Sequence, residues 1–370
     1  MSLNDAAAPG AEEAARLPSP KRRWLLPALS ISLALAALLS TALGESPLDV
    51  AEALTRPDST AAAILFDLRL PHVALCALVG AALAFAGAAL QALLRNPLAD
   101  PFILGVSGGA ALGATISLAL GGASLGLFLA TPCRHLPGPV AGLCAATFGE
   151  SPTTLAALIG AIAATAIVHG ASRVSGRVSP LRALLAGVVF NALASAAITF
   201  VKVLSPPDRL GEVTHWLSGN LGYPGTGALI ALAIFETIAF AVVFVGAHSL
   251  NLLSLGDRGA ALLGLDVDRA RAVLFFALSL LVAAAVSVSG MIGFVGLIVP
   301  HLVRRVSGAD QRRLLPASAL AGASFLLLAD LGARCLLPLL GTTPPVGALT
   351  AFVGAPFFLG MLKGGEVRGG

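Results

Sequence analysis

Charged residues are scarce in this chain: Asp, Glu, Lys and Arg together make up 11% of its 370 residues. A soluble domain carries about 25%, because its surface must stay hydrated. Aromatic residues are also few, at 5%, whereas 57% of the chain is hydrophobic. With a mean hydropathy of +0.91, the composition excludes a soluble globular enzyme, a disordered chain and a nucleic-acid-binding protein. It indicates an all-α, polytopic membrane protein whose helices are rich in Ala and Gly and pack closely.

Signatures of enzymatic chemistry are missing as well. The chain has no G-x-x-x-x-G-K-[ST] phosphate loop, so we expect that it does not hydrolyse ATP itself. Its six His residues show no metal-ligand spacing, and no nucleophile–base pattern stands out. We therefore expect no catalytic residue, no metal site and no cofactor in this chain, and no nucleic-acid partner.

Long apolar runs are what the chain does contain. A helix needs about 20 apolar residues to cross the hydrocarbon core. Residues 1–20 predict a disordered tail, and residues 21–366 predict a single transmembrane domain. We expect ten membrane segments, at 24–44, 72–94, 102–120, 153–170, 182–202, 228–248, 272–289, 297–306, 314–334 and 346–363. The eighth is short because a Gly-rich turn at 290–296 breaks an uncharged run, and broken helices are tolerated only inside protein or around a cavity.

The placement of the cations predicts the orientation. With the N-terminus inside, seventeen of the 23 Lys and Arg residues fall on the cytoplasmic side. The other six are Arg56, Arg69, Arg134, Lys202, Arg209 and Arg334. This asymmetry follows the positive-inside rule and predicts that both termini are cytoplasmic.

Parts of the two halves of the chain are similar. Leu78, Gly87 and Pro97 recur as Leu281, Gly290 and Pro300, all at an offset of 203. On the ten-segment map the two copies enter the membrane from opposite sides. This predicts an inverted repeat, as in many transporters, although chance similarity between Ala- and Leu-rich helices is the alternative.

Several motifs in order carry a family resemblance. They lie at 67–71, 80–91, 95–101, 104–110, 293–301, 328–330 and 354–358. Together they resemble the permease subunits of the FecCD family, which are type II ATP-binding-cassette importers for iron-siderophores, cobalamin and haem. The resemblance covers most of residues 60–363. It implies the ten-helix fold of a cobalamin-importer permease in the bacterial inner membrane, with a metal chelate as its substrate.

The resemblance also implies an assembly. We expect a homodimer of this chain, two ATP-binding-cassette ATPase subunits that hold ATP and Mg, and a periplasmic substrate-binding protein. Residues 251–266, called the coupling segment below, carry two short apolar patches that each end at Gly, which suits two small helices. In the family this segment docks on the ATPase, and a plain amphipathic connector is the alternative. The candidate coupling residues are Leu253, Leu255, Gly256, Asp257, Arg258, Leu263 and Gly264.

Two further sites follow from the resemblance. Arg69 and Arg334 match positions that dock the binding protein, and His72 stands where the family often has a further Arg. Arg at a helix end also snorkels, and Arg334 can pair with Asp330. The translocation path follows the fifth segment. The candidate path and gate residues are Ser179, Pro180, Asn191, Ser195, Thr199, Ser205 and Pro206. Asn191, Ser195 and Thr199 share one helix face, which suits either a pore lining or hydrogen bonds between helices.

Glu236 and two cysteines complete the candidates. A charge in mid-span costs at least about 2.5 kcal/mol, so Glu236 is either a neutral acid packed inside the bundle or a proton site. A proton-coupled secondary transporter that uses Glu236 is therefore the alternative function. Cys133 and Cys144 lie in the long outer loop, where a disulfide is plausible in an oxidising compartment.

Overall fold

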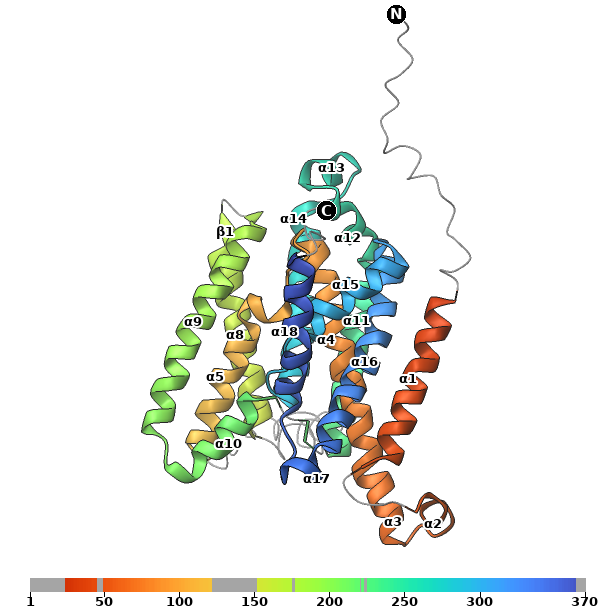
Figure 1. Ribbon diagram of the computed structural model, residues 1–370. Coiled ribbons are helices and arrows are strands. Elements are labelled where there is room, and N and C mark those ends of the chain that lie inside the picture. Colours follow the sequence, from red (N-terminus) through yellow and green to blue (C-terminus); the bar gives the residue numbers. More distant parts are fainter. Residues whose placement is uncertain are drawn as a thin grey trace, which may run out of the picture.

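The computed structural model describes residues 24–44, 49–121, 152–174, 177–219, 221–222 and 225–363 (Figure 1). Almost all of these residues are helical. The helices before the hairpin are α1 (Leu25–Ala42), α2 (Val50–Thr55), α3 (Thr60–Ala63), the π-helix η2 (Ile64–Arg69), α4 (Leu70–Leu93), the 3₁₀ turn η3 (Pro101–Leu104), α5 (Val106–Ala119) and α8 (Pro152–Ser172). The hairpin pairs β1 (Arg173–Val174) with β2 (Arg177–Val178) in antiparallel register.

Among the described residues that follow the hairpin, every regular element is a helix. These helices are α9 (Pro180–Leu204), α10 (Pro207–Leu217), α11 (Thr226–Val245), α12 (Ala247–Ser254), α13 (Asp257–Leu262), α14 (Val267–Ser289), α15 (Val295–Ser307), α16 (Gln311–Cys335), α17 (Leu337–Leu340) and α18 (Val346–Lys363). The predicted tail at 1–20 and the cysteines Cys133 and Cys144 lie outside the described residues.

Each of the ten predicted membrane segments corresponds to a helix. Seven described helices are long and apolar enough to cross a membrane, and α5 and α18 are shorter apolar helices. The short segment α15 follows a break at which Gly290 and Phe294 adopt φ of 67° and 69°. The broken helix at 290–296 is thus confirmed.

Some predicted boundaries were wrong. The second spanning helix starts at Thr60 rather than at residue 72, and it includes Asp67 and Arg69, which the sequence map placed outside. α14 starts at Val267 rather than at residue 272, because the Asp266 carboxylate accepts a hydrogen bond from the Arg269 backbone N–H and caps the helix. Gly105, at φ 82°, separates η3 from α5 within the predicted segment 102–120. The surface helix α10 was not predicted.

α4 occupies the centre of the molecule, and α1 and α9 lie at its periphery. The most apolar stretch of the α4 span is 78% buried, compared with 11% for α1 and 11% for α9. Small residues allow this: the backbones of Gly80 and Gly322 meet where α4 crosses α16, and those of Gly87 and Gly296 meet where α4 crosses α15. Close backbone approach lets helices pack in the absence of a hydrophobic driving force.

α4 and α14 run in opposite directions, as the predicted inverted repeat requires. Arg95, just after α4, and Arg271, near the start of α14, both bind Asp257 of α13. The end of one helix therefore lies beside the start of the other. We call the end of the molecule that carries α12 and α13 the coupling end (top of Figure 1); α2, α10 and α17 lie at the opposite end.

Candidate functional site

The coupling segment forms the two short helices that its sequence predicts. α12 buries Ala247, Leu250 and Leu253 against the bundle. Gly256 then turns the chain at φ 100°, and Gly264 turns it again at φ 85°. Residues with a Cβ rarely adopt such a φ, so glycine is required at both turns. The segment is therefore a folded unit and not an extended connector.

Asp257 joins the coupling segment to two spanning helices. Its Oδ1 accepts hydrogen bonds from Arg95 Nη2 at 2.9 Å and from Arg271 Nη2 at 2.8 Å. Its Oδ2 accepts a third from Arg271 Nη1 at 3.2 Å. The hydrogen bonds from Arg271 lower the pKa of the Asp257 carboxyl, with a further contribution from the charge of Arg95. We call these three residues the Asp257 clamp.

The Asp257 clamp also holds an unfavourable backbone conformation. Arg95 is one of two described non-glycine residues at positive φ, with a φ of 50°. The left-handed conformation costs an L-residue about 1–2 kcal/mol. The Arg271 side chain is 4% exposed, and its guanidinium pairs with Asp257, which is 46% exposed.

A second connection joins α12 to the start of α16. Asn251 Nδ2 donates to Asp310 Oδ1 at 2.8 Å, and Asn251 Oδ1 accepts from the Gln311 backbone N–H at 2.9 Å. Because α12 follows directly on α11, the segment is tied to the ends of α4, α11, α14 and α16. The coupling segment is therefore anchored to four helices.

Three leucines of the coupling segment face outward. Leu255 is 66% exposed, Leu262 is 88% exposed and Leu263 is 60% exposed. They lie in or next to α12 and α13 at the coupling end, in a stretch that also carries polar residues. Exposed apolar groups rimmed by polar residues mark an interaction surface.

The structure gives the predicted coupling residues different surroundings. Leu255, Arg258 and Leu263 are exposed, whereas Leu253 is buried and packs α12 onto the bundle. Asp257 belongs to the clamp. Leu262 was not among the candidates, and the signal that could have found it is a pair of leucines directly before a glycine in a polar stretch.

The predicted inner gate residues line a cavity at the coupling end. Ser179 and Pro180 start α9, and a cavity of about 460 Å³ lies between them and the loop that follows α4. Arg95 lines the same cavity. Arg95 thus belongs to the Asp257 clamp and also lines the cavity beside the start of α9.

The predicted polar face of α9 is split. Asn191 Nδ2 donates to the Phe102 carbonyl of η3 at 2.8 Å, so this side chain makes a bond between helical elements. Ser195 and Thr199 are exposed, and the Thr199 hydroxyl donates to the Ser195 carbonyl. At the opposite end, Ser205 ends α9 and Pro206 precedes α10.

The two arginines predicted to dock a binding protein hold the end of α1. Arg69 Nη1 donates to the Thr41 carbonyl at 2.7 Å. Arg334 Nη1 donates to the Ser40 and Leu43 carbonyls at 3.3 Å each. The last carbonyls of a helix lack intrahelical partners and carry partial negative charge, which cations stabilise. Arg69 is 7% exposed, so it does not stand open on the outer face; its docking role stays a prediction.

His72, Cys76 and Asp330 gather beside Arg334. Their ligand atoms lie within 4.8 Å of one another, a grouping that no sequence spacing reveals because Asp330 comes from α16. Asp330 Oδ2 already binds His72 Nε2 at 3.0 Å and Arg334 Nε at 2.9 Å, so a metal ion would compete with a guanidinium. Cys76 Sγ and Asp330 Oδ2 both contact the same atom, His72 Nε2. In a catalytic triad the nucleophile and the acid contact different ring nitrogens of the histidine, so these three residues do not form one. These side chains therefore connect α4 to α16 through the His72–Asp330 contact, and Arg334 connects α16 to the end of α1.

Glu236 lies fully buried in α11. Among the described residues neither of its carboxyl oxygens has a hydrogen-bond partner. An isolated buried carboxylate is costly, so the geometry favours the neutral acid.

Comparison with known proteins gives consistent results. The sequence profile of the FecCD transport family matches residues 29–363. The cobalamin import system permease protein BtuC of Halobacterium salinarum is 40% identical over 309 residues, covering 84% of this chain and 76% of that protein. The hemin transport system permease protein HmuU of Yersinia pestis is 40% identical over 308 residues, covering 83% and 85%. A solved structure of a metal-chelate type ABC transporter in an inward-facing conformation matches with a TM-score of 0.74 at 28% identity, covering 92% of this chain and 99% of that one.

Proposed function

Because this chain belongs to the FecCD transport family and is a permease subunit of an ATP-binding-cassette importer, we propose that it carries a metal chelate from the periplasm to the cytoplasm. The relatives named for cobalamin and hemin transport support this class of cargo. The cargo is an iron-siderophore, haem or cobalamin, and its metal travels as part of the substrate.

The observation that carries the mechanism is the coupling segment. Its exposed leucines, Leu255, Leu262 and Leu263, offer an apolar surface that fits a groove on an ATPase subunit. When ATP and Mg bind on that partner and it closes, the segment moves. Within the Asp257 clamp, Asp257 moves with α13 and displaces Arg95. Arg95 lines the cavity beside Ser179 and Pro180, so the motion reaches that cavity.

The proposed assembly has two copies of this chain and two ATPase subunits, with the coupling end in the cytoplasm. The excess of Lys and Arg in the loops assigned to that side supports the orientation. A periplasmic binding protein delivers the chelate at the opposite end. The docking surface at that end is shaped by Arg69, His72 and Arg334, which hold α1, α4 and α16 together. In the dimer, α9 of one copy faces α9 of the other copy across the pathway.

Reconstitution into proteoliposomes tests the proposal. Uptake of a radiolabelled chelate is measured with the neighbouring ATPase, without it, and with a proton ionophore. Leu262→Glu and Leu255→Glu place a charge on the proposed docking surface and should abolish ATP-driven uptake. Leu262→Met and Leu255→Met keep an apolar side chain of similar volume at the same positions, so they are the matched controls and should keep it. Uptake that persists in Leu262→Glu and Leu255→Glu would contradict the docking assignment.

Proton-coupled transport through Glu236 is the second candidate, and the unpartnered burial of that carboxyl is the observation in its favour. The same experiment separates the two. Uptake that needs no ATPase, collapses with the ionophore and is lost in Glu236→Gln would establish the carrier and overturn the importer.

A further inference from the structure

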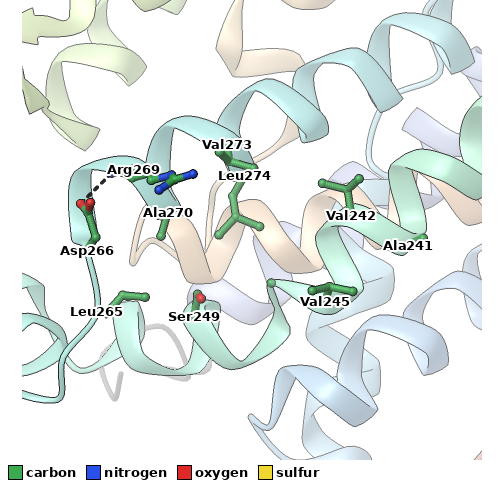
Figure 2. Close-up of a pocket in the computed structure, with 11 residues that line it drawn as sticks. Ala241, Val242, Val245, Ser249, Leu265, Asp266, Arg269, Ala270, Val273 and Leu274 are labelled. Atoms are coloured by element: carbon green, nitrogen blue, oxygen red, sulfur yellow. Dashed lines mark hydrogen bonds between the residues drawn. The ribbon is translucent and has the colours of Figure 1, made fainter.

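A cleft opens between α11 and α14 at the coupling end (Figure 2). Its volume is about 630 Å³, and α12 and Leu265 close it on the side of the coupling segment. Most of its lining is apolar, with Val242 and Val245 from α11 and Val273 from α14. All three valines are exposed, at 42%, 84% and 50% respectively. The cleft therefore presents an unfilled apolar surface.

The two charged lining residues lie together at one end of the cleft. Figure 2 shows Asp266 and Arg269 beside each other, with the valines farther along. Among the described residues the Arg269 guanidinium makes no hydrogen bond or ion pair; only its backbone N–H is used, by the Asp266 carboxylate at 3.1 Å. A cation and an anion thus stand at the mouth without pairing to each other.

The direction of the cleft matches that of a lipid. α11 ends at Val245 and α14 begins at Val267, and both helices can span a membrane. Because a helix rises about 1.5 Å per residue, Val273 lies about 6 Å deeper than Arg269. Val242 lies likewise deeper than Val245. The charged end faces the level of the headgroups and the apolar end faces the hydrocarbon.

We propose that this cleft binds one phospholipid with an ethanolamine headgroup. The phosphate accepts charge-assisted hydrogen bonds from Arg269, and the ammonium group donates to the free oxygen of Asp266. An acyl chain lies along Val242, Val245 and Val273. The bound lipid packs against α12, so it stiffens the coupling segment. This site does not depend on the nature of the transported cargo.

Native mass spectrometry of the purified full-length protein in detergent tests the site. The apparent Kd of the first bound lipid is measured for dioleoyl-phosphatidylethanolamine, dioleoyl-phosphatidylglycerol and dioleoyl-phosphatidylcholine. We expect the ethanolamine lipid to bind most tightly. Arg269→Gln should weaken it by about tenfold, since a hydrogen bond to a charged group is lost. Glycerol phosphate in solution should not compete, because it lacks the acyl chains.

Asp266→Asn separates the two charged contacts. Asparagine caps a helix as well as aspartate does, so α14 keeps its start while the anion is removed. This variant should weaken the ethanolamine lipid and leave the glycerol lipid unchanged. Ala270→Phe, which fills the cleft, should weaken all three lipids.

Arg313→Gln is the matched control. Arg313 is exposed and lies three residues after the capping residue Asp310, as Arg269 does after Asp266, but it does not line this cleft. It should bind lipid as the unchanged protein does. Equal losses in Arg269→Gln and Arg313→Gln, or equal affinity for the ethanolamine and choline lipids, would overturn the proposal. Loss of lipid binding when the ATPase or a second copy covers the cleft would also overturn it.

Discussion

Asp257 is the residue on which the proposed transmission depends. It is the shared acceptor for an arginine that follows α4 and for one that begins α14. Arg271 lies in the bundle with a side chain 4% exposed. A buried charge that loses its counter-ion is costly, more so than an exposed pair that is broken. The carboxylate therefore fixes where α13 sits relative to two helices.

Asp257→Asn should uncouple transport. The change keeps the shape of the side chain and removes its charge, so we expect ATP-driven uptake to fall by roughly threefold to tenfold while ATP hydrolysis by the assembled complex continues. The ratio of chelate transported to ATP hydrolysed measures this. His248→Gln, at an exposed residue of α12 with no assigned role, should leave the ratio unchanged. An unchanged ratio in Asp257→Asn would remove the clamp from the mechanism.

The pH dependence of the Asp257 clamp follows from the same contacts. The pKa of Asp257 lies below its ordinary value of 3.8. Its contribution to stability is therefore fully present above that ordinary value and is lost only as the pH falls through the lowered pKa. The transport ratio measured at pH 7 and at pH 5 should be the same. A ratio that falls already at pH 5 would show that another group controls coupling.

At the scale of the helices, close backbone contact governs the core. A methyl group added at Gly87 of α4 would meet the carbonyl oxygen of Gly296 in α15. Backbone cannot yield as a flexible side chain does, and overpacking costs about 1–3 kcal/mol. The start of α15 and the second half of α4 thus approach closely because neither Gly87 nor Gly296 carries a side chain.

Gly87→Ala should lower the thermal unfolding temperature of the purified protein. Gly170→Ala is the matched control, since Gly170 is also helical, in α8, and a Cβ there meets nothing within 4 Å. Alanine favours a helix over glycine by about 1 kcal/mol, so the control should be neutral or slightly stabilising. Scanning fluorimetry of both variants gives the comparison. Equal unfolding temperatures would indicate that α15 moves to accommodate the methyl group.

The exposed face of α9 can be tested for whether it lines the pathway. Ser195 and Thr199 are exposed, whereas Asn191 is bonded to Phe102. If the exposed face lines the pathway, Ser195→Cys and Thr199→Cys should react with a membrane-impermeant thiol reagent, and Asn191→Cys should react much more slowly. The measurement uses a background in which the four native cysteines are replaced by serine. Protection of all three positions would place this face against lipid or protein.

Composition and the lengths of the apolar runs are enough to predict the membrane segments, but not the contacts between them. Spans and the break at 290–296 are local: each depends on hydropathy or on glycines within a few residues. Asp257, Arg95 and Arg271 are separated along the chain, and nothing near any of them signals the other two. The sequence likewise predicts Arg69 as an exposed charge on the outer side. In the structure its guanidinium instead donates to a carbonyl at the end of α1.

Orientation is the prediction that belongs to the molecule as a whole. Epitope tags added at the N-terminus and at the C-terminus should both be cleaved by protease in inside-out vesicles and protected in spheroplasts, because the excess of Lys and Arg places both termini in the cytoplasm. Immunoblotting with each tag reads this out. A tag cleaved in intact spheroplasts would reverse the assignment of the coupling end.

The enclosure of α4 has a consequence for how the protein is made. Synthesis proceeds from the N-terminus, so α4 enters the bilayer long before α14, α15 and α16 exist to surround it. Its apolar sequence is stable in lipid, yet the bare backbone at Gly80 and Gly87 meets its partners only when the last third of the chain arrives. Biogenesis therefore passes through a stage in which the future centre of the molecule is its surface. A chain that stops after α11 would remain inserted but uncompacted, a ready substrate for membrane proteases.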